Sequence, residues 1–284
     1  MQKIYLATTL LSTLALCDTT DKEIENRVPS FYNNQSVVHL VSEIGYTNYG
    51  IDITSTEFNR AIDYQLVELT VGAEYHYNRW GYGAFYKFSA DEIGTNSIVD
   101  DTGGEDKAHV DRDEFVLSLS YLWKDFEFDY KGELFSNLSY YSSSLKSDDS
   151  FEVFNTYTSS YRYDTQGVSL SLSSVQKPWG DAHALTLTGG FLYTVADIGI
   201  YATKNAEDRA VYVKDSGVGA YGVKFGIGYA YEVNPNFGLK ISTDWYYLDF
   251  EDINIYSHEK VGLLEKGTLN ESTYSLRVGG AYRF

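Results

Sequence analysis

Two residue types are nearly absent from this 284-residue chain: cysteine occurs once and proline three times. One cysteine cannot form a disulfide within the chain, and Cys17 ends an apolar run near the N-terminus. No stretch of about 20 consecutive apolar residues, the length of a membrane-spanning helix, occurs in the sequence. Mean hydropathy is −0.30, so composition and pattern together argue against a helical membrane protein.

Positive charge is also scarce, since 22 Lys and Arg residues stand against 40 Asp and Glu residues, a formal net charge of −18. A surface of this sign repels nucleic acids and anionic substrates, so we expect no nucleic-acid partner. Aromatic residues are abundant instead, at 16% of the chain with 27 Tyr. Aromatic side chains favour β-strands and the boundary between water and an apolar phase.

The N-terminal residues 1–17 resemble an export signal peptide, because Lys3 precedes a short apolar run that ends at Cys17. We expect simple cleavage near this position. The alternative is lipidation of Cys17, although Leu16 stands where a lipoprotein motif has a small residue. Residues 18–36 are polar and are interpreted as a periplasmic lead-in, and residues 37–284 as the folded domain.

From Val37 onward, apolar and polar residues alternate in segments of about ten residues or more, separated by turn-forming residues. A period of two is typical of strands, and segments of this length suit a tilted membrane crossing. We expect ten strands, with eight or twelve as alternatives, at residues 37–51, 62–78, 82–92, 113–123, 126–142, 161–177, 183–200, 212–232, 237–254 and 271–284.

The expected connections alternate in length. Short turns are expected at 78–81, 123–126, 177–181 and 233–236, and long polar loops at 52–61, 93–112, 143–160, 201–211 and 255–270. Three of the four Trp residues fall at the short turns, and Trp245 lies toward the opposite end of its strand. A soluble β-sandwich would also show alternation, but it gives no reason to gather Trp80, Trp123 and Trp179 at one end.

The last strand ends at the last residue, with apolar side chains on one face. Arg277, Gly279, Tyr282 and Phe284 match, in order, the C-terminal pattern of bacterial outer-membrane proteins: a polar residue, a glycine, and two hydrophobic residues separated by one. Residues 37–284 therefore resemble the outer-membrane β-barrels of Gram-negative bacteria. The resemblance implies an all-β fold, a closed antiparallel transmembrane β-barrel with short periplasmic turns and long outer loops. It also implies outer-membrane localisation, with outer-membrane lipids, lipopolysaccharide, the barrel-assembly machinery and periplasmic chaperones as partners.

Ionisable residues alternate with the apolar face and are expected to point into the lumen. These candidate lumen charges are Glu43, Glu68, Glu74, Lys87, Lys131, Glu133, Lys224, Lys240, Asp244 and Arg277. One interpretation is a charge network that fills a small lumen; the other is a solute path or an acid–base site. Ten strands lie just above the size that side chains can fill and far below that of open porins, so we expect a plugged or narrow lumen.

The enzymatic alternative is a surface hydrolase with a divergent site. The architecture resembles the ten-stranded omptin proteases, which carry an acidic pair and an Asp–His pair near the outer rim, but the expected loop 201–211 contains no His. His109 with Asp111, and His258, lie in or near other outer loops, where a lone His is usually a solvated side chain. No His is followed by the Ser-Asn-Gly-like stretch of outer-membrane phospholipases.

The other histidines, His39, His76 and His183, stand apart in the sequence and show no metal-ligand spacing. Between Asp100 and Glu114 the chain is acidic but lacks the ligand order of an EF-hand, so we expect a solvated loop there. We expect no catalytic residue, cofactor or metal. We expect a barrel at the cell surface with a structural, adhesive or narrow-channel (porin-like) role. The alternative is a surface hydrolase, either an omptin-like protease or a lipid-modifying enzyme.

Overall fold

The computed structural model describes residues 36–55, 59–89, 97–100, 105–107, 110–127, 131–147, 157–204, 209–257 and 263–284. The expected leader and nearly all of the lead-in lie outside these residues. The elements are β1 (Val37–Thr54), β2 (Asn59–Tyr77), β3 (Trp80–Ser89), β4 (Ser97–Asp100), β5 (Glu105–Lys107), β6 (Val110–Glu127), β7 (Lys131–Ser147), β8 (Tyr157–Lys177), β9 (His183–Lys204), β10 (Arg209–Asn234), β11 (Phe237–Ser257) and β12 (Leu263–Arg283). The described part contains no helix long and apolar enough to cross a membrane.

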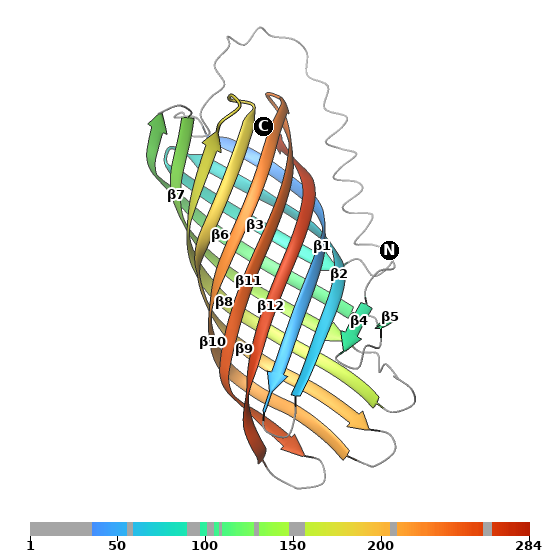
Figure 1. Cartoon of the computed structure of the whole chain (residues 1–284). Coiled ribbons are helices and arrows are strands. Elements are labelled where there is room, and N and C mark those ends of the chain that lie inside the picture. Colours follow the sequence, from blue (N-terminus) through green and yellow to red (C-terminus); the bar gives the residue numbers. More distant parts are fainter. Residues whose placement is uncertain are drawn as a thin grey trace.

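Ten of these strands close into one antiparallel barrel (Figure 1). Going round the barrel, the order is β1-β2-β3-β6-β7-β8-β9-β10-β11-β12, and β12 pairs back with β1. Closure gives the first and last strands a partner on both sides, which removes the free sheet edges. β4 and β5 form a short hairpin beside β2, where β4 pairs with Ile62–Gln65 beyond the end of β3. The expected ten-stranded barrel is confirmed, with this hairpin added in a stretch expected to be a loop.

One expected turn was wrong. β6 runs through residues 123–126 to Glu127, which pairs with Lys131 at the start of β7, so the connection falls within 128–130, outside the described residues. The polar pair after Trp123 does not end the strand, because a register shift between Leu122 and Lys124 accommodates an extra residue as a β-bulge. Trp123 therefore lies on a strand near the short-turn end.

Most strands are longer than expected. A tilted crossing takes about 9–11 residues, whereas β8, β11 and β12 each have 21, β9 has 22 and β10 has 26. Most of the added length lies away from the short turns; for example, Lys204 pairs with Arg209 where residues 201–211 were expected to form a loop. The barrel therefore continues well beyond the part that a membrane needs.

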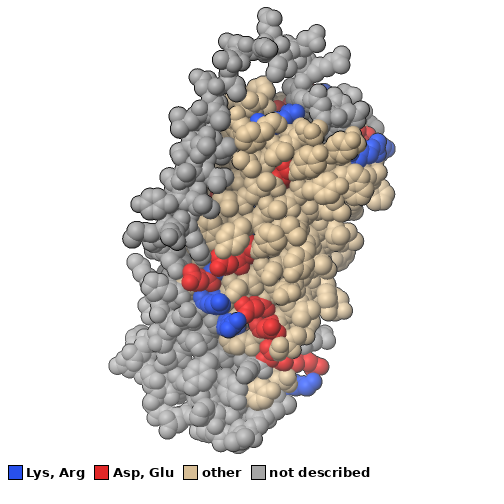
Figure 2. Space-filling view, turned by 180° about the vertical axis from the view of Figure 1, so that it is seen from behind, with Lys and Arg blue, Asp and Glu red and all other residues tan. Residues whose placement is uncertain are grey.

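A belt of exposed apolar side chains surrounds the part next to the short turns. Outward-facing residues spread over five strands are between 47% and 72% exposed: Ile44, Leu138, Leu170, Phe191 and Phe225. Figure 2 shows a broad uncharged surface, with charged side chains gathered mostly toward its lower end. Aromatic side chains border the belt, with Trp80, Tyr121, Trp123 and Trp179 at the short-turn end and Trp245 and Tyr274 at the other. An apolar band between aromatic girdles is the surface that faces lipid, so this part of the barrel spans a membrane. Following the usual layout of such barrels, we call the end with the short turns the periplasmic end and the opposite end the outer end.

The alternation inverts at the outer edge of the belt. On β1, the apolar residues Ile44 and Tyr46 face outward and are exposed. Farther along the same strand, the apolar residues Tyr49, Ile51 and Ile53 face inward and are buried. Likewise on β11, outward Trp245 gives way to outward Asp249, whose neighbours Leu248 and Phe250 are buried inside. Apolar side chains face lipid within the membrane and face inward once the outside is water, so the inversion marks where the barrel leaves the membrane.

Candidate functional site

The lumen is the candidate site, and its inward side chains form three layers. The periplasmic layer surrounds a cavity, the middle layer is a network of charges, and the outer layer is apolar. The registers of the strands set this order, because inward residues on β1 run from His39 through Glu43 and Thr47 to Tyr49 and Ile53.

The middle layer centres on Arg112 of β6. Its guanidinium forms ion pairs with Glu68 on β2 and with Glu114 on its own strand, and Lys87 on β3 also pairs with Glu114. The Thr47 hydroxyl donates a hydrogen bond of 2.5 Å to Glu68 Oε2. A charge withdrawn from water is stable only when it is paired, and the Nη1 and Nη2 groups of Arg112 are both paired here, whereas its buried Nε has no hydrogen-bond partner among the described residues.

A second group of charges crosses the seam where β11, β12 and β1 meet. Arg277 Nε lies 3.4 Å from Glu43 Oε2, and the same guanidinium pairs with Asp244. Lys240 Nζ lies 3.1 Å from Glu43 Oε1. Glu43, which is only 7% exposed, is therefore held by two cations from neighbouring strands.

The other candidate lumen charges take different positions. Lys224 donates a hydrogen bond to Ser169 Oγ at 2.8 Å, and no carboxylate of the described residues lies at ion-pair distance from it. Glu133 is buried against the periplasmic cavity. Lys131 lies at the periplasmic rim, more than half exposed, and pairs with Asp181 at 3.1 Å. The structure thus places Lys131 at the mouth of the barrel and not within the lumen.

The outer layer closes the lumen with apolar side chains. Its members are almost completely buried: Tyr49, Ile51, Ile53, Tyr64, Leu66, Val110, Leu145, Tyr163, Ile198, Phe250, Ile253, Ile255 and Leu269. The rings of Tyr49 on β1 and Tyr163 on β8 lie 6.2 Å apart between centroids, although these strands are five positions apart in either direction round the barrel. Side chains of opposite walls therefore touch and block this level of the lumen.

One carboxylate is buried among these side chains. Glu271 on β12 is 2% exposed and accepts hydrogen bonds from the hydroxyls of Tyr49, Tyr163 and Tyr246. Sequence reasoning singled out neither Glu271 nor Arg112. It also assigned Glu114 to a solvated acidic loop, which was wrong, because Glu114 is an inward residue of β6 and is paired.

The alternation of inward and outward residues along β6 indicates the positions of Arg112 and Glu114. Val110, Arg112 and Glu114 share the inner face, while Asp111 and Asp113 alternate with them on the outside. Reading the strand from residue 110, three residues earlier than expected, would have placed Arg112 and Glu114 in the lumen.

The histidines fall into three groups. His109 and His258, the candidates for a hydrolase site, lie outside the described residues, and Asp111 is an exposed residue of β6. His183 faces outward, where Nδ1 lies 2.7 Å from the Tyr229 hydroxyl and its ring stacks on that of Tyr229. His39 and His76 lie together on the inner face, beside the periplasmic cavity.

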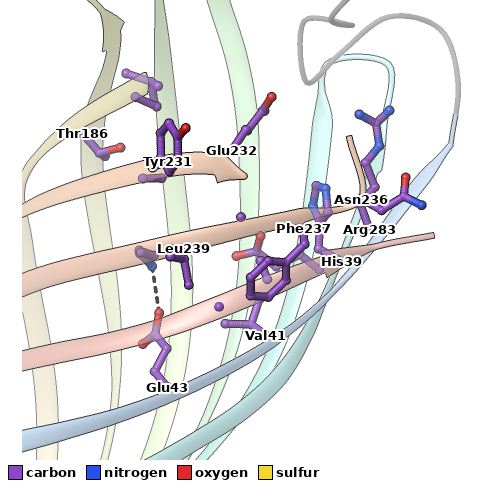
Figure 3. A pocket seen from close by; sticks show the side chains of 18 of the residues that line it. His39, Val41, Glu43, Thr186, Tyr231, Glu232, Asn236, Phe237, Leu239 and Arg283 are labelled. Carbon is purple, nitrogen blue, oxygen red and sulfur yellow. Dashed lines mark ion pairs between the residues drawn. The ribbon is translucent and has the colours of Figure 1, made fainter. Parts of the chain in front are cut away.

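The periplasmic cavity has a volume of about 340 Å³ and is open to solvent. Figure 3 shows the lining residues His39, Val41 and Glu43 of β1 with Leu239 of β11 and Tyr231 of β10, and Arg283 of β12 beside His39. Carboxylates outnumber cations among its ionisable lining residues, with Glu43, Glu74, Glu133 and Glu232 against Lys240 and Arg283. The cavity therefore favours a small cation over an anion.

The four residues of the expected assembly signal all lie on or directly after β12. The Phe284 N–H donates to Val38 O at 3.0 Å, and its ring packs edge-on against Tyr282 while 64% of the residue is exposed. A Cβ at Gly279 would lie 2.3 Å from the Ser42 carbonyl oxygen, so the close approach of β12 to β1 requires glycine there. Whether the assembly machinery reads these residues stays a prediction.

No protein-family model and no curated protein sequence matches the chain. Among solved structures, it is similar to the outer membrane protease OmpT from Escherichia coli, with 12% identity, 88% of this chain and 96% of that chain covered, and a TM-score of 0.54. It is also similar to the outer membrane protein OprG from Pseudomonas aeruginosa, with 10% identity, 89% of this chain and 98% of that chain covered, and a TM-score of 0.43. At these identities the OmpT likeness describes the fold alone. The closed barrel, its lipid-facing belt and this shared fold make the chain an outer-membrane β-barrel protein.

Proposed function

We propose that this protein is a closed-lumen barrel with a structural and adhesive role at the cell surface, not a solute channel. The contact between Tyr49 and Tyr163 across the outer lumen carries the proposal, because it joins opposite walls. The charge network around Arg112 lies directly below this apolar layer and is paired within itself. A solute would have to displace both layers, at a cost comparable to opening a protein core.

The part of the barrel beyond the membrane supports the adhesive role. Its strands have a packed core of their own, which makes it a rigid platform for the outer connections. Its outward face is acidic, with exposed carboxylates on several strands: Asp52, Asp63, Asp197 and Asp249. Burial, and to a smaller extent the neighbouring Asp52 carboxylate, raise the pKa of Asp63.

This acidic zone lies just beyond the outer aromatic girdle, at the level of lipid headgroups. Divalent cations that bind oxygen ligands can bridge carboxylates to the phosphates of lipopolysaccharide. For this reason we propose lipopolysaccharide and outer-membrane lipids as partners. We propose the barrel-assembly machinery and periplasmic chaperones as further partners, because the C-terminal residues Arg277, Gly279, Tyr282 and Phe284 match the C-terminal pattern of outer-membrane proteins.

The conductance of the purified barrel in planar bilayers tests the closed lumen. A general porin, inserted in the same bilayers, is the positive control. We expect no steady conductance from the wild type. Steady conductance whose ion selectivity changes on Lys224→Glu would overturn the proposal and favour a selective channel, since Lys224 faces the middle layer.

Adherence of intact cells tests the adhesive role separately. Cells producing the barrel should adhere to epithelial or abiotic surfaces more strongly than cells without it. The variant Asp52→Asn/Asp63→Asn/Asp249→Asn should change this adherence without changing the amount of folded barrel. Equal adherence by producing and non-producing cells would leave only the structural role.

A further inference from the structure

Three potential metal ligands converge at the periplasmic end of the lumen. His39 on β1 is the register partner of Glu74 on β2, and His76 follows Glu74 by two residues on the same inner face. Taking one ligand atom from each residue, these atoms all lie within 4.8 Å of one another. The two imidazole rings lie edge to face with centroids 5.3 Å apart, and His76 Nε2 lies 3.5 Å from Glu74 Oε2.

The strand geometry explains why spacing along the chain conceals this cluster. His39 and His76 are 37 positions apart, but antiparallel pairing of β1 with β2 makes them diagonal neighbours on one face. The local backbone also leaves room for the His76 ring. Its register partner on β3 is Gly81, and a Cβ there would lie 3.0 Å from His76 Nδ1.

The surroundings suit a cation that enters from the periplasm. His39 and Glu74 line the 340 Å³ cavity, so the cluster is next to solvent-accessible space. The cavity lining has more carboxylates than basic groups, and of these carboxylates Glu43 is already paired with Arg277 and Lys240. His39 and the His76 side chain are nearly buried, whereas the Glu74 side chain is 38% exposed. Two nearly buried imidazoles and one more accessible carboxylate leave the cluster accessible from the cavity.

We propose that His39, Glu74 and His76 bind a divalent transition-metal ion, with Zn²⁺ as the preferred ion. Two imidazole nitrogens and one carboxylate oxygen form a ligand set that Zn²⁺ accepts, with water from the cavity as the remaining ligand. Ligand atoms around a tetrahedral Zn²⁺ lie about 3.4 Å apart, so small side-chain rotations suffice to bring the three atoms into range. Imidazole ligands disfavour Mg²⁺ and Ca²⁺, which select oxygen.

Zinc titration of the mature barrel, purified from outer membranes without a histidine tag, tests the proposal. Isothermal titration should show one Zn²⁺ per barrel, and Co²⁺ in its place should give the visible absorption of a tetrahedral nitrogen–oxygen site. His39→Ala and His76→Ala should each weaken Zn²⁺ binding by at least about tenfold, as should Glu74→Gln. Mg²⁺ and Ca²⁺ should not compete.

The chain contains five histidines, so the three that lie outside the proposed site can all be substituted as controls. His183→Ala is the matched control, because His183 is at the same end of the barrel but faces outward. The double variant His109→Ala/His258→Ala removes the histidines of the outer connections. Both control variants should bind Zn²⁺ as the wild type does.

Glu74→Gln keeps the size and shape of the side chain and replaces one carboxylate oxygen with an amide NH2 group, so it reports on binding even where a histidine variant folds poorly. Unchanged affinity in Glu74→Gln and His76→Ala would overturn the proposal. Loss of binding in the His109→Ala/His258→Ala variant, with binding retained in His39→Ala, would place the metal in the outer loops and also overturn it.

Discussion

The Tyr163 hydroxyl on β8 donates a hydrogen bond to the Glu271 carboxylate on β12, four strands away round the barrel. Glu271 is 2% exposed and lies among apolar side chains, so its oxygens depend on protein donors. Tyr49 and Tyr246 supply two more hydroxyl donors. The outer lumen is thus closed by a packed core that contains one carboxylate with three tyrosine donors.

Removing one of these donors should destabilise the folded barrel. Tyr163→Phe keeps the ring contacts but leaves a Glu271 oxygen without its donor, which should lower the free energy of unfolding by about 1–3 kcal/mol. Urea unfolding in lipid vesicles measures the change. Tyr221→Phe is the matched control, because Tyr221 is outward and 74% exposed. Equal effects of the two substitutions would contradict the dependence of Glu271 on Tyr163.

The seam charges should contribute more than charges at the outer surface. Arg277→Met leaves Glu43 with Lys240 as its remaining ion-pair partner, and we expect a loss of about 3 kcal/mol in the free energy of unfolding. Lys266→Met is the control, since Lys266 pairs with Asp252 where both side chains are more than half exposed. That exposed pair should contribute at most about 0.5 kcal/mol. The same unfolding assay tests both variants, and a loss in Arg277→Met no larger than that in Lys266→Met would contradict the larger contribution of the seam charges.

The strand count and the lipid-facing belt could be predicted from the sequence because both depend on local information. Alternation places Ile44 and Phe225 on one face of their strands, and residues such as Asn234-Pro235-Asn236 form tight turns wherever they occur. The C-terminal pattern ending at Phe284 added an independent indication of the same fold.

The outer apolar layer was not predicted, because the inner face was assumed to be polar along the whole strand. The inversion on β1, from outward Ile44 and Tyr46 to inward Tyr49 and Ile51, is visible in the sequence as a change of phase. The expected strand 37–51 included Tyr49 and Ile51, but the change of phase within it was not interpreted as the passage from lipid to water. The meeting of His39 with His76 could not be read from spacing, since it depends on the register between two strands.

Cysteine labelling of intact cells should show which end of the barrel faces outward. Lys266→Cys is in the exposed outer part of β12, and Pro235→Cys is in the tight turn between β10 and β11. A membrane-impermeant maleimide should label the first on intact cells and the second only after permeabilisation, because the apolar belt separates them. The wild type, whose Cys17 we expect to be removed with the leader, is the blank. Labelling of Pro235→Cys on intact cells would reverse the orientation.

A substitution of Phe284 separates a role of this residue in assembly from a role in stability. Phe284 is 64% exposed and its ring contacts Tyr282, and the hydrogen bond from its backbone N–H to Val38 does not depend on the side chain. Phe284→Ala should therefore change the free energy of unfolding of the refolded barrel by less than about 1 kcal/mol, as for an exposed residue. In cells, however, it should lower the amount of barrel in the outer membrane several-fold, because the substitution removes a position of the matched C-terminal pattern. Leu276→Ala, an exposed belt residue of the same strand outside that pattern, is the control for reduced lipid contact. Normal outer-membrane levels of Phe284→Ala would remove Phe284 from the assembly signal, whereas a large loss of stability in the refolded protein would assign it a structural role.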